Sequence, residues 1–199
     1  MNKIFEYIII GPPKVGKTSL ILRYFDNVFF NTSYNTIGID MRSKLFLDYG
    51  NYTIKLNIYD TAGQERYANI VSNFIKNKGC ILLCFSLSSL SSFEDCKKYS
   101  RMINEIKDPN TIVILVGTFK DMVNICKNIN KLEVEEFIKE NDYKYYEVSA
   151  KSGEGIKELF MDTVKLMIYN NLERKETSNI NLLSSSISYL SNPFKNKCC

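Results

Sequence analysis

Apolar residues along the chain gather in short runs, and the segments between these runs carry helical periodicity. The short runs are rich in Ile, Val, Leu, Tyr and Phe, which favours β-strands. The strands predicted are Ile4–Ile10, Met41–Leu47, Thr53–Tyr59, Cys80–Phe85, Thr111–Val116 and Lys144–Val148. The helices predicted are Lys17–Phe25, Glu65–Lys76, Ser92–Ile106, Lys131–Asn141 and Ile156–Glu173. Strands that alternate with helices are typical of an α/β fold built on a mostly parallel sheet.

One hairpin and one change of composition refine this prediction. The segment DYGNYT puts Gly50 and Asn51 in a turn between two adjacent strands, so one edge of the sheet is expected to be antiparallel. From about Arg174 the chain becomes rich in Ser and Asn and loses its periodicity. We therefore predict a folded domain over residues 1–173 and a flexible tail over residues 174–199.

Composition narrows the class of protein. The chain has 199 residues, of which 45% are hydrophobic and 24% are charged, values typical of one soluble globular domain. Its formal net charge of +4 is small for this length, so we predict no broad nucleic-acid face. The sequence contains no histidine, which excludes His general bases, Ser/His and Cys/His nucleophile pairs and His-containing zinc sites.

The cysteines and the apolar segments indicate a compartment. The six cysteines lack the close, even framework of a small secreted domain, which favours a reducing cytosolic environment. The run IFEYIII is interrupted by Glu6 and leads straight into GPPK, unlike a signal peptide. Since no segment reaches the roughly 18 apolar residues of a membrane-spanning helix, contact with a membrane would need another device.

The segment GPPKVGKT, Gly11 to Thr18, follows a predicted strand and opens a predicted helix. In this context the backbone N–H groups of the loop and the helix dipole point at one place, where phosphate is the natural occupant. Lys17 would bridge the terminal phosphates, and the Thr18 hydroxyl would hold Mg²⁺. The alternative is a glycine-containing turn with an exposed lysine. Pro12 and Pro13 have no N–H to offer a ligand.

The segment YDTAGQERY, Tyr59 to Tyr67, ends the third predicted strand. An Asp at the carboxyl end of a strand can hold a metal through water, and a following Gly offers an open amide to a terminal phosphate. Asp60 and Gly63 occupy these positions, and Gln64 would orient a water molecule. The alternative is a solvated turn that opens the helix at Glu65.

Together these segments resemble the Rab family within the Ras superfamily of small GTPases. The likeness runs from about Lys3 to Ile168. It includes Thr36 in NTIGID, the segment KLNIYD, the Ser92-Phe93 pair and the segment EVSAK from Glu147 to Lys151. The resemblance implies a Ras-like P-loop GTPase fold with three layers, in which a six-stranded, mostly parallel sheet carries helices on both faces.

The resemblance also implies an activity and its residues. The protein would bind GTP or GDP with Mg²⁺ and hydrolyse GTP slowly, with Lys17 and Gln64 as catalytic residues. Mg²⁺ would be held by Thr18, Thr36 and Asp60. The nucleotide would be contacted by Gly11, Lys14, Val15, Gly16, Lys17, Thr18, Ser19, Phe29, Thr36, Gly63, Thr118, Asp121, Ser149, Ala150 and Lys151.

Partners follow from the same resemblance. A monomer that cycles between two nucleotide states would meet an exchange factor, a GTPase-activating protein, effector proteins and a prenyl-binding escort. It would regulate vesicle trafficking at the cytoplasmic face of an intracellular membrane and cycle with the cytosol. Cys198 and Cys199 resemble the cysteine pair of Rabs that carry two geranylgeranyl groups, and two lipids give stable anchoring where one does not. The alternative is a free terminus with two exposed thiols.

Two positions depart from the family pattern in the loop that reads the base. Thr118 and Phe119 stand where relatives commonly have Asn and Lys, whereas Asp121 is retained. The Asp121 carboxylate would accept from the guanine N1–H and exocyclic amine. Phe119 offers a flat apolar face but lacks the ammonium that ties the base loop to the phosphate loop. We therefore expect guanine to be chosen but released faster than from a standard Rab.

The phosphate loop departs as well. Lys14 stands where many relatives have a small residue, and a positive φ there would cost on the order of 1 kcal/mol. Pro13 would lie beside Gln64, where a partner's arginine finger enters, so the rate of hydrolysis would change.

Two alternatives to the Rab-like function stay open. A membrane-tethered scaffold with permanent or no nucleotide is favoured by Pro13, Thr118 and Phe119, and a Rho-like cytoskeletal regulator is favoured by Thr118.

Overall fold

The structure is a computed structural model that describes residues 2–32, 36, 38–49, 52–63, 73–76, 78–122 and 129–170. Its strands are β1 (Asn2–Ile10), β2 (Ile39–Tyr49), β3 (Tyr52–Thr61), β4 (Cys80–Ser86), β5 (Ile112–Thr118) and β6 (Lys144–Glu147). Its helices are α1 (Lys17–Asp26), α3 (Leu90–Ile106), α4 (Lys131–Asn141), a 3₁₀ turn at Lys120–Met122 and a C-terminal helix over residues 156–170.

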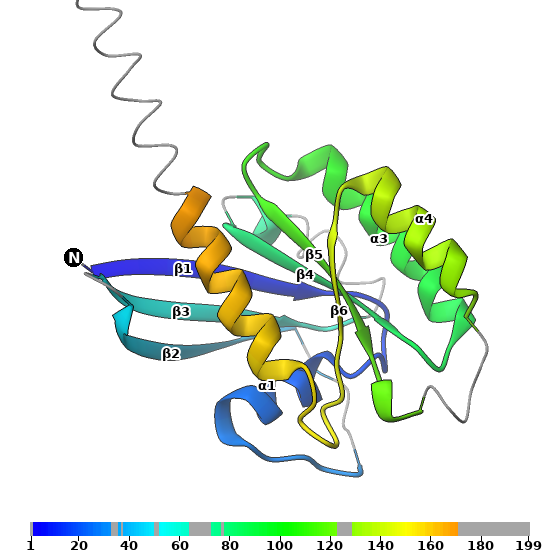
Figure 1. Cartoon of the computed structure of the whole chain (residues 1–199), viewed down its shortest axis with the longest axis horizontal. Coiled ribbons are helices and arrows are strands. Elements are labelled where there is room, and N and C mark those ends of the chain that lie inside the picture. Colours follow the sequence, from blue (N-terminus) through cyan, green and yellow to red (C-terminus); the bar gives the residue numbers. More distant parts are fainter. Residues whose placement is uncertain are drawn as a thin grey trace, which may run out of the picture.

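The six strands form one sheet in the order β2-β3-β1-β4-β5-β6 (Figure 1). Neighbouring strands are parallel throughout, except that β2 runs antiparallel to β3. The predicted sheet, with one antiparallel edge, is therefore confirmed. Because parallel strands end at the same edge, the segments that follow β1, β3 and β5 meet there. These are the segments that carry the two phosphate-related motifs and the base loop.

Helices cover both faces of the sheet (Figure 1). Along β1, Tyr7 and Ile9 face α1 and the C-terminal helix, whereas Ile8 and Ile10 face α3 and α4. All four side chains are at most 1% exposed, as expected for a central strand covered on both sides. The core between the sheet and α1 also contains the apolar stripe of the C-terminal helix, made of Ile156, Leu159, Phe160, Val164 and Met167. The predicted three-layer α/β architecture is confirmed.

The limits of several elements differ slightly from the predictions. β2 begins at Ile39, before the predicted Met41, because its backbone already pairs with Thr61 of β3. α3 begins at Leu90 instead of Ser92, because the Ser89 hydroxyl accepts from the Ser92 N–H and caps the helix. Such shifts of about two residues are usual at element ends.

Some predicted segments lie wholly or partly outside the described residues. They are the Gly50-Asn51 turn, most of the helix predicted over Glu65–Lys76, the last three residues of the helix predicted to end at Glu173, and the tail over residues 174–199. Of the predicted Glu65 helix, residues 73–76 are described, and residues 73–75 are helical. None of the helices in the described part of the chain has the length and apolar content needed to cross a membrane.

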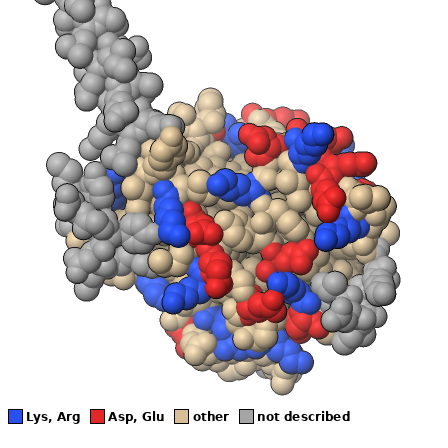
Figure 2. Space-filling view, in the orientation of Figure 1, with Lys and Arg blue, Asp and Glu red and all other residues tan. Residues whose placement is uncertain are grey.

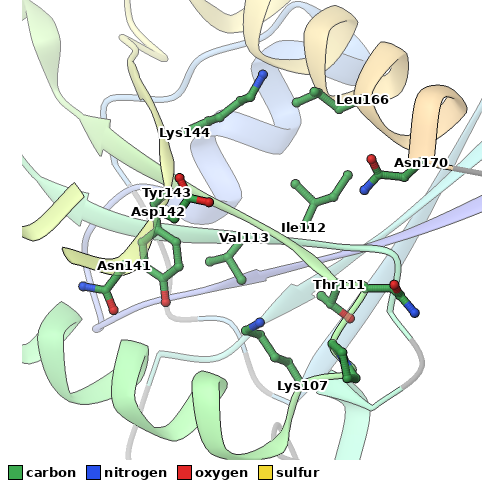
Figure 3. A pocket seen from close by; sticks show the side chains of 12 residues that line it. Lys107, Thr111, Ile112, Val113, Asn141, Asp142, Tyr143, Lys144, Leu166 and Asn170 are labelled. Atoms are coloured by element: carbon green, nitrogen blue, oxygen red, sulfur yellow. The ribbon is translucent and has the colours of Figure 1, made fainter. Parts of the chain in front are cut away.

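A hollow of about 560 Å³ opens at the amino ends of β5 and β6, away from the motif residues (Figure 3). Lys107, Lys144 and Asn170 contribute to its lining from three different segments (Figure 3). Its more buried hydroxyls already have partners, since Thr111 donates to the Lys78 carbonyl at 2.8 Å and Tyr143 donates to Asn104 at 3.2 Å. Ligands of open α/β sheets bind outside the carboxyl ends of the strands, which is the opposite edge from this hollow.

Candidate functional site

The loop between β1 and α1 is shaped by two glycines and a strained lysine. Gly11 has φ 148°, and a Cβ there would lie 2.2 Å from the Cys84 carbonyl oxygen of β4. Gly16 has φ 82° and directly precedes the first helical residue. Lys14 has φ 63°, the left-handed conformation that costs a non-glycine residue on the order of 1 kcal/mol. The loop therefore packs tightly against the sheet and turns its backbone toward the start of α1.

Lys17 lies almost fully buried inside this loop. Its side chain is 6% exposed, and its ammonium donates to the carbonyls of Gly11 and Pro12, each at 2.8 Å. Burial lowers the pKa of the Lys17 ammonium to about 8. Among the described residues this ammonium donates to neutral carbonyls, and a desolvated ammonium gains strongly from a nearby anion. Pro12 takes part through its carbonyl, which its missing N–H does not affect.

Three oxygen-bearing side chains from three segments meet beside Lys17. The Thr18 hydroxyl donates to Asp60 Oδ2 at 2.7 Å, and the Thr36 hydroxyl lies 2.8 Å from the Thr18 hydroxyl. Since the Thr18 proton goes to Asp60, Thr36 is the donor in the second bond. Asp60 is 4% exposed, and burial raises the pKa of its carboxyl.

This group of oxygens fits a hard divalent cation. Asp60 Oδ1 is buried and has no hydrogen-bond partner among the described residues. A buried carboxylate oxygen without a partner is costly, and Mg²⁺ with its bound waters would satisfy it. The described residues contain no cluster of three or more Cys, Asp or Glu, so a cation here would depend on Asp60 together with hydroxyls and water.

Gly63 closes the site from the end of β3. A Cβ at this position would lie 2.5 Å from the Lys17 ammonium and 2.6 Å from the Pro12 carbonyl, so only glycine fits. The Tyr99 hydroxyl of α3 donates to the Gly63 carbonyl at 3.3 Å and helps to hold it there. The next residue, Gln64, predicted to orient a water molecule, lies outside the described residues.

Two adjoining cavities extend along the loop. The first, of about 130 Å³, is lined by Lys14, Lys17, Thr18, Thr36 and Gly63 among others. The second, of about 250 Å³, is lined mainly by Thr118, Asp121, Ala150 and Lys151 at its far end. Both cavities share a set of lining residues, namely Gly16, Ser19, Phe29, Asn31 and Phe119. The first cavity, at the cation site, has the more polar lining, and the second, at Asp121, has the more apolar lining.

Backbone and side-chain hydrogen bonds interlock the loops around the second cavity. The Thr118 hydroxyl lies 2.7 Å from the Val15 carbonyl and 2.8 Å from the Phe85 carbonyl, so its proton is engaged by the protein. The buried Ser149 hydroxyl donates to Asp121 Oδ1 at 2.6 Å. Asp121 itself is exposed at the rim. Among the described residues its second carboxylate oxygen has no hydrogen-bond partner, so this oxygen can accept from a ligand.

Phe119 lies against the phosphate loop. Its φ is 57°, and its ring atoms lie 3.3 and 3.6 Å from the position of a Cβ at Gly16. The neighbouring Lys120 points elsewhere, because its ammonium bonds Glu154 Oε1 at 2.6 Å. The ring therefore replaces the missing ammonium by van der Waals contact with Gly16. The sequence did not predict this contact.

Most of the residues predicted for the site thus lie together at one edge of the sheet, whatever ligand they bind. Val15 contributes through its carbonyl, since its side chain is 1% exposed. Cys198 and Cys199 lie outside the described residues. Sequence reasoning missed Asn31, which lines both cavities, and Arg23, which bonds Ala150 in the loop after β6. Neither position belongs to a motif, so the sequence held no signal for them.

Comparisons with known proteins match the same part of the chain. A family model described as the Ras family matches residues 6–169. The chain is 30% identical over 165 residues to Ras-related protein Rab-4 of Dictyostelium discoideum, covering 83% of this chain and 80% of the relative. It is 29% identical over 165 residues to human Rab-4B, covering 83% of this chain and 76% of the relative. It is 29% identical over 197 residues to bovine Rab-13, covering 99% and 96%.

Proposed function

The chain belongs to the Ras family of small GTPases, and within it to the Rab proteins; on that premise we propose a GTP/GDP switch that hydrolyses GTP slowly and recruits effectors to vesicle membranes. The observation that carries the proposal is a pair of adjoining cavities with shared lining residues, in which Lys17, Thr18 and Thr36 line one cavity and Asp121 lines the other. Such a pair of cavities suits a ligand with anionic phosphates at one end and a polar-edged base at the other.

At the phosphate end, Lys17 would exchange its two carbonyl acceptors for β- and γ-phosphate oxygens. Thr18, Thr36 and Asp60 would hold Mg²⁺, which neutralises charge on the phosphates when bound. The Gly63 amide would donate to the γ-phosphate, and Gln64 would orient the attacking water in line with the bond to the leaving GDP. Since the reaction needs positioning and charge stabilisation only, no covalent intermediate with the protein is required.

The same contacts make the site a switch. Thr36 contacts Thr18, and Gly63 lies against Lys17 and Pro12, each next to a segment outside the described residues. With the γ-phosphate present both residues would be tethered, and with GDP both tethers would be lost together. The segments around Thr36 and after Gly63 would therefore relax on hydrolysis.

Three exposed apolar side chains on the outer strands support the proposal of effector binding. Ile4 and Leu45 both align with Lys55 of β3 and are 62% and 58% exposed. Met41, aligned with Tyr59, is 52% exposed on the same face. β2 follows the Thr36 segment and β3 leads into Gly63, so a partner bound over Met41 would lie near both segments that respond to the γ-phosphate. Elsewhere, on the face seen in Figure 2, basic and acidic side chains are interspersed, as the small net charge leads one to expect.

A single-turnover experiment tests the proposal. Protein loaded with GTP is expected to release one phosphate per bound nucleotide in Mg²⁺ buffer, at a rate on the order of 10⁻⁴ to 10⁻² s⁻¹. Chelation of Mg²⁺ should suppress the release, and Gln64→Leu should slow it at least about tenfold while GTP still binds. Tight nucleotide binding without Mg²⁺-dependent phosphate release would instead support the membrane-tethered scaffold.

The departure at Phe119 leads to a separate prediction. Phe119→Lys is expected to slow GDP dissociation about three- to tenfold, because an ammonium donating to the phosphate loop contributes about 0.5–1.5 kcal/mol. The substitution is well matched, because Phe and Lys bear the same backbone strain at φ 57°. Stopped-flow release of a fluorescent GDP measures the rate, and Phe119→Leu serves as the control that adds no ammonium. Equal rates for Phe119→Lys and the natural protein would contradict the prediction.

A further inference from the structure

Arg23 of α1 makes four hydrogen bonds to two separate segments. Its Nε donates to the Ala150 carbonyl at 2.6 Å, and one terminal nitrogen donates to the Lys151 carbonyl at 2.8 Å. The other terminal nitrogen donates to the backbone carbonyl of Asn27 at 3.0 Å and to its side-chain oxygen at 3.2 Å. The bond to Ala150 is partly buried, which limits competition from water.

The two segments form different parts of the wall around the second cavity. Ala150 and Lys151 line it from the loop after β6. Asn27 caps the C-terminal end of α1 with φ 55°, and Phe29, two residues later, also lines the cavity. The stem of Arg23 supports the same loop, since its Cδ lies 3.9 Å from the position of a Cβ at Gly153. One guanidinium therefore holds both walls.

The helix that carries Arg23 also begins the phosphate site. Gly16 and Lys17 stand at its first turn, and Arg23 follows Thr18 by five residues, a rise of roughly 8 Å along the axis. A helix of this length behaves as a rigid spacer, so it fixes the separation between phosphate contacts and base walls. The planar fork of Arg suits this task because it donates in several fixed directions at once.

We propose that Arg23 is a positioning residue that pre-forms the base pocket and makes its two walls open together. This inference rests on the proposed function, since it assumes that the second cavity takes the guanine base. Displacement of either wall breaks bonds of the same guanidinium, which removes support from the other wall. Arg23 thereby sets the rate of nucleotide release without touching the nucleotide.

A second arginine at the same end of α1 provides a matched control. Arg42 of β2 pairs with Asp26 of α1, and neither residue lines the two cavities. Its side chain is 35% exposed, so it is accessible to the same kind of substitution. Arg42→Met removes one guanidinium from this helix end but leaves both base walls in place.

The experiment measures GDP dissociation from the natural protein and three variants in Mg²⁺ buffer. We expect Arg23→Met to accelerate release about tenfold, Arg23→Lys to accelerate it about threefold because one ammonium replaces part of the fork, and Arg42→Met to stay within twofold. Equal acceleration by Arg23→Met and Arg42→Met, or no acceleration by Arg23→Met, would overturn the proposal. If Arg23→Met fails to fold, the comparison of Arg23→Lys with Arg42→Lys decides in the same way.

Hydrogen exchange of the GDP-loaded proteins tests the coupling of the walls. Arg23→Met should raise exchange in residues 27–31 and 149–153 together, and Arg42→Met should raise it in neither. Faster exchange in only one of the two segments would refute the common brace. Absence of GDP binding by the natural protein would overturn the proposed function itself, whereas normal binding with unchanged Arg23 variants would overturn this inference alone.

Discussion

Lys17→Ala is expected to weaken GDP and GTP binding at least about 100-fold. The ammonium is 6% exposed and reaches two carbonyls in the middle of the phosphate loop, the position from which it would contact two phosphate groups. Two charge-assisted hydrogen bonds contribute about 3 kcal/mol together, which corresponds to roughly 100-fold in affinity. Isothermal titration in Mg²⁺ buffer at one fixed salt concentration measures the change.

The control for this prediction removes the same charge far from the site. Lys165 on the C-terminal helix pairs with Asp162 on the surface, and its side chain is 57% exposed. Lys165→Ala should therefore leave both affinities within about twofold. Affinities of Lys17→Ala within tenfold of the natural protein would mean that the loop does not grip phosphate through this side chain, and the proposed mechanism would fail.

Asp121→Asn is expected to lower the affinity for GDP more than about 100-fold and to create affinity for xanthosine diphosphate. Guanine presents N1–H and an amine to the Asp121 carboxylate, whereas xanthine presents an oxygen in place of the amine. The Ser149 hydroxyl donates to Asp121 Oδ1 at 2.6 Å and would bond the amide oxygen of the variant in the same way. The amide nitrogen would then face the base, where it repels guanine donors and donates to xanthine.

Competition between GDP and xanthosine diphosphate for the variant measures this change of base preference. An unmatched buried polar group discriminates strongly between bases, so the ratio of the two affinities should change by several orders of magnitude. Ser149→Ala is the informative control, because it frees both Asp121 oxygens and should keep the preference for guanine. Retention of GDP preference by Asp121→Asn would show that Asp121 does not read the base.

The predicted sheet succeeded because its signals are local. Central strands such as Cys80–Phe85 are buried on both faces and read as continuous apolar runs. The apolar residues of the C-terminal helix repeat at three- and four-residue steps, and they pack as one face on the core that α1 shares. The start of α3 was predicted two residues late because its cap is a serine side chain rather than a change in periodicity.

In the site, too, residues within one contiguous segment were predicted, and contacts between distant segments were not. The two phosphate-related segments are contiguous in the chain, so residue types at fixed spacing indicated Lys17, Thr18 and Asp60 before any fold was known. Contacts between distant segments had no such signal. Thr118 bonds Val15, 103 residues away, and Arg23 bonds Ala150, 127 residues away.

The sequence by itself determined the order of strands and helices, the phosphate-type loop and the presence of an acid at each end of the site. Only the tertiary structure decided that the Phe119 ring covers Gly16, that Gly63 closes on Lys17 and that one arginine braces both base walls. The physical reason is that local patterning is encoded in spacing, whereas these contacts arise when sheet topology brings the ends of separate strands to one edge.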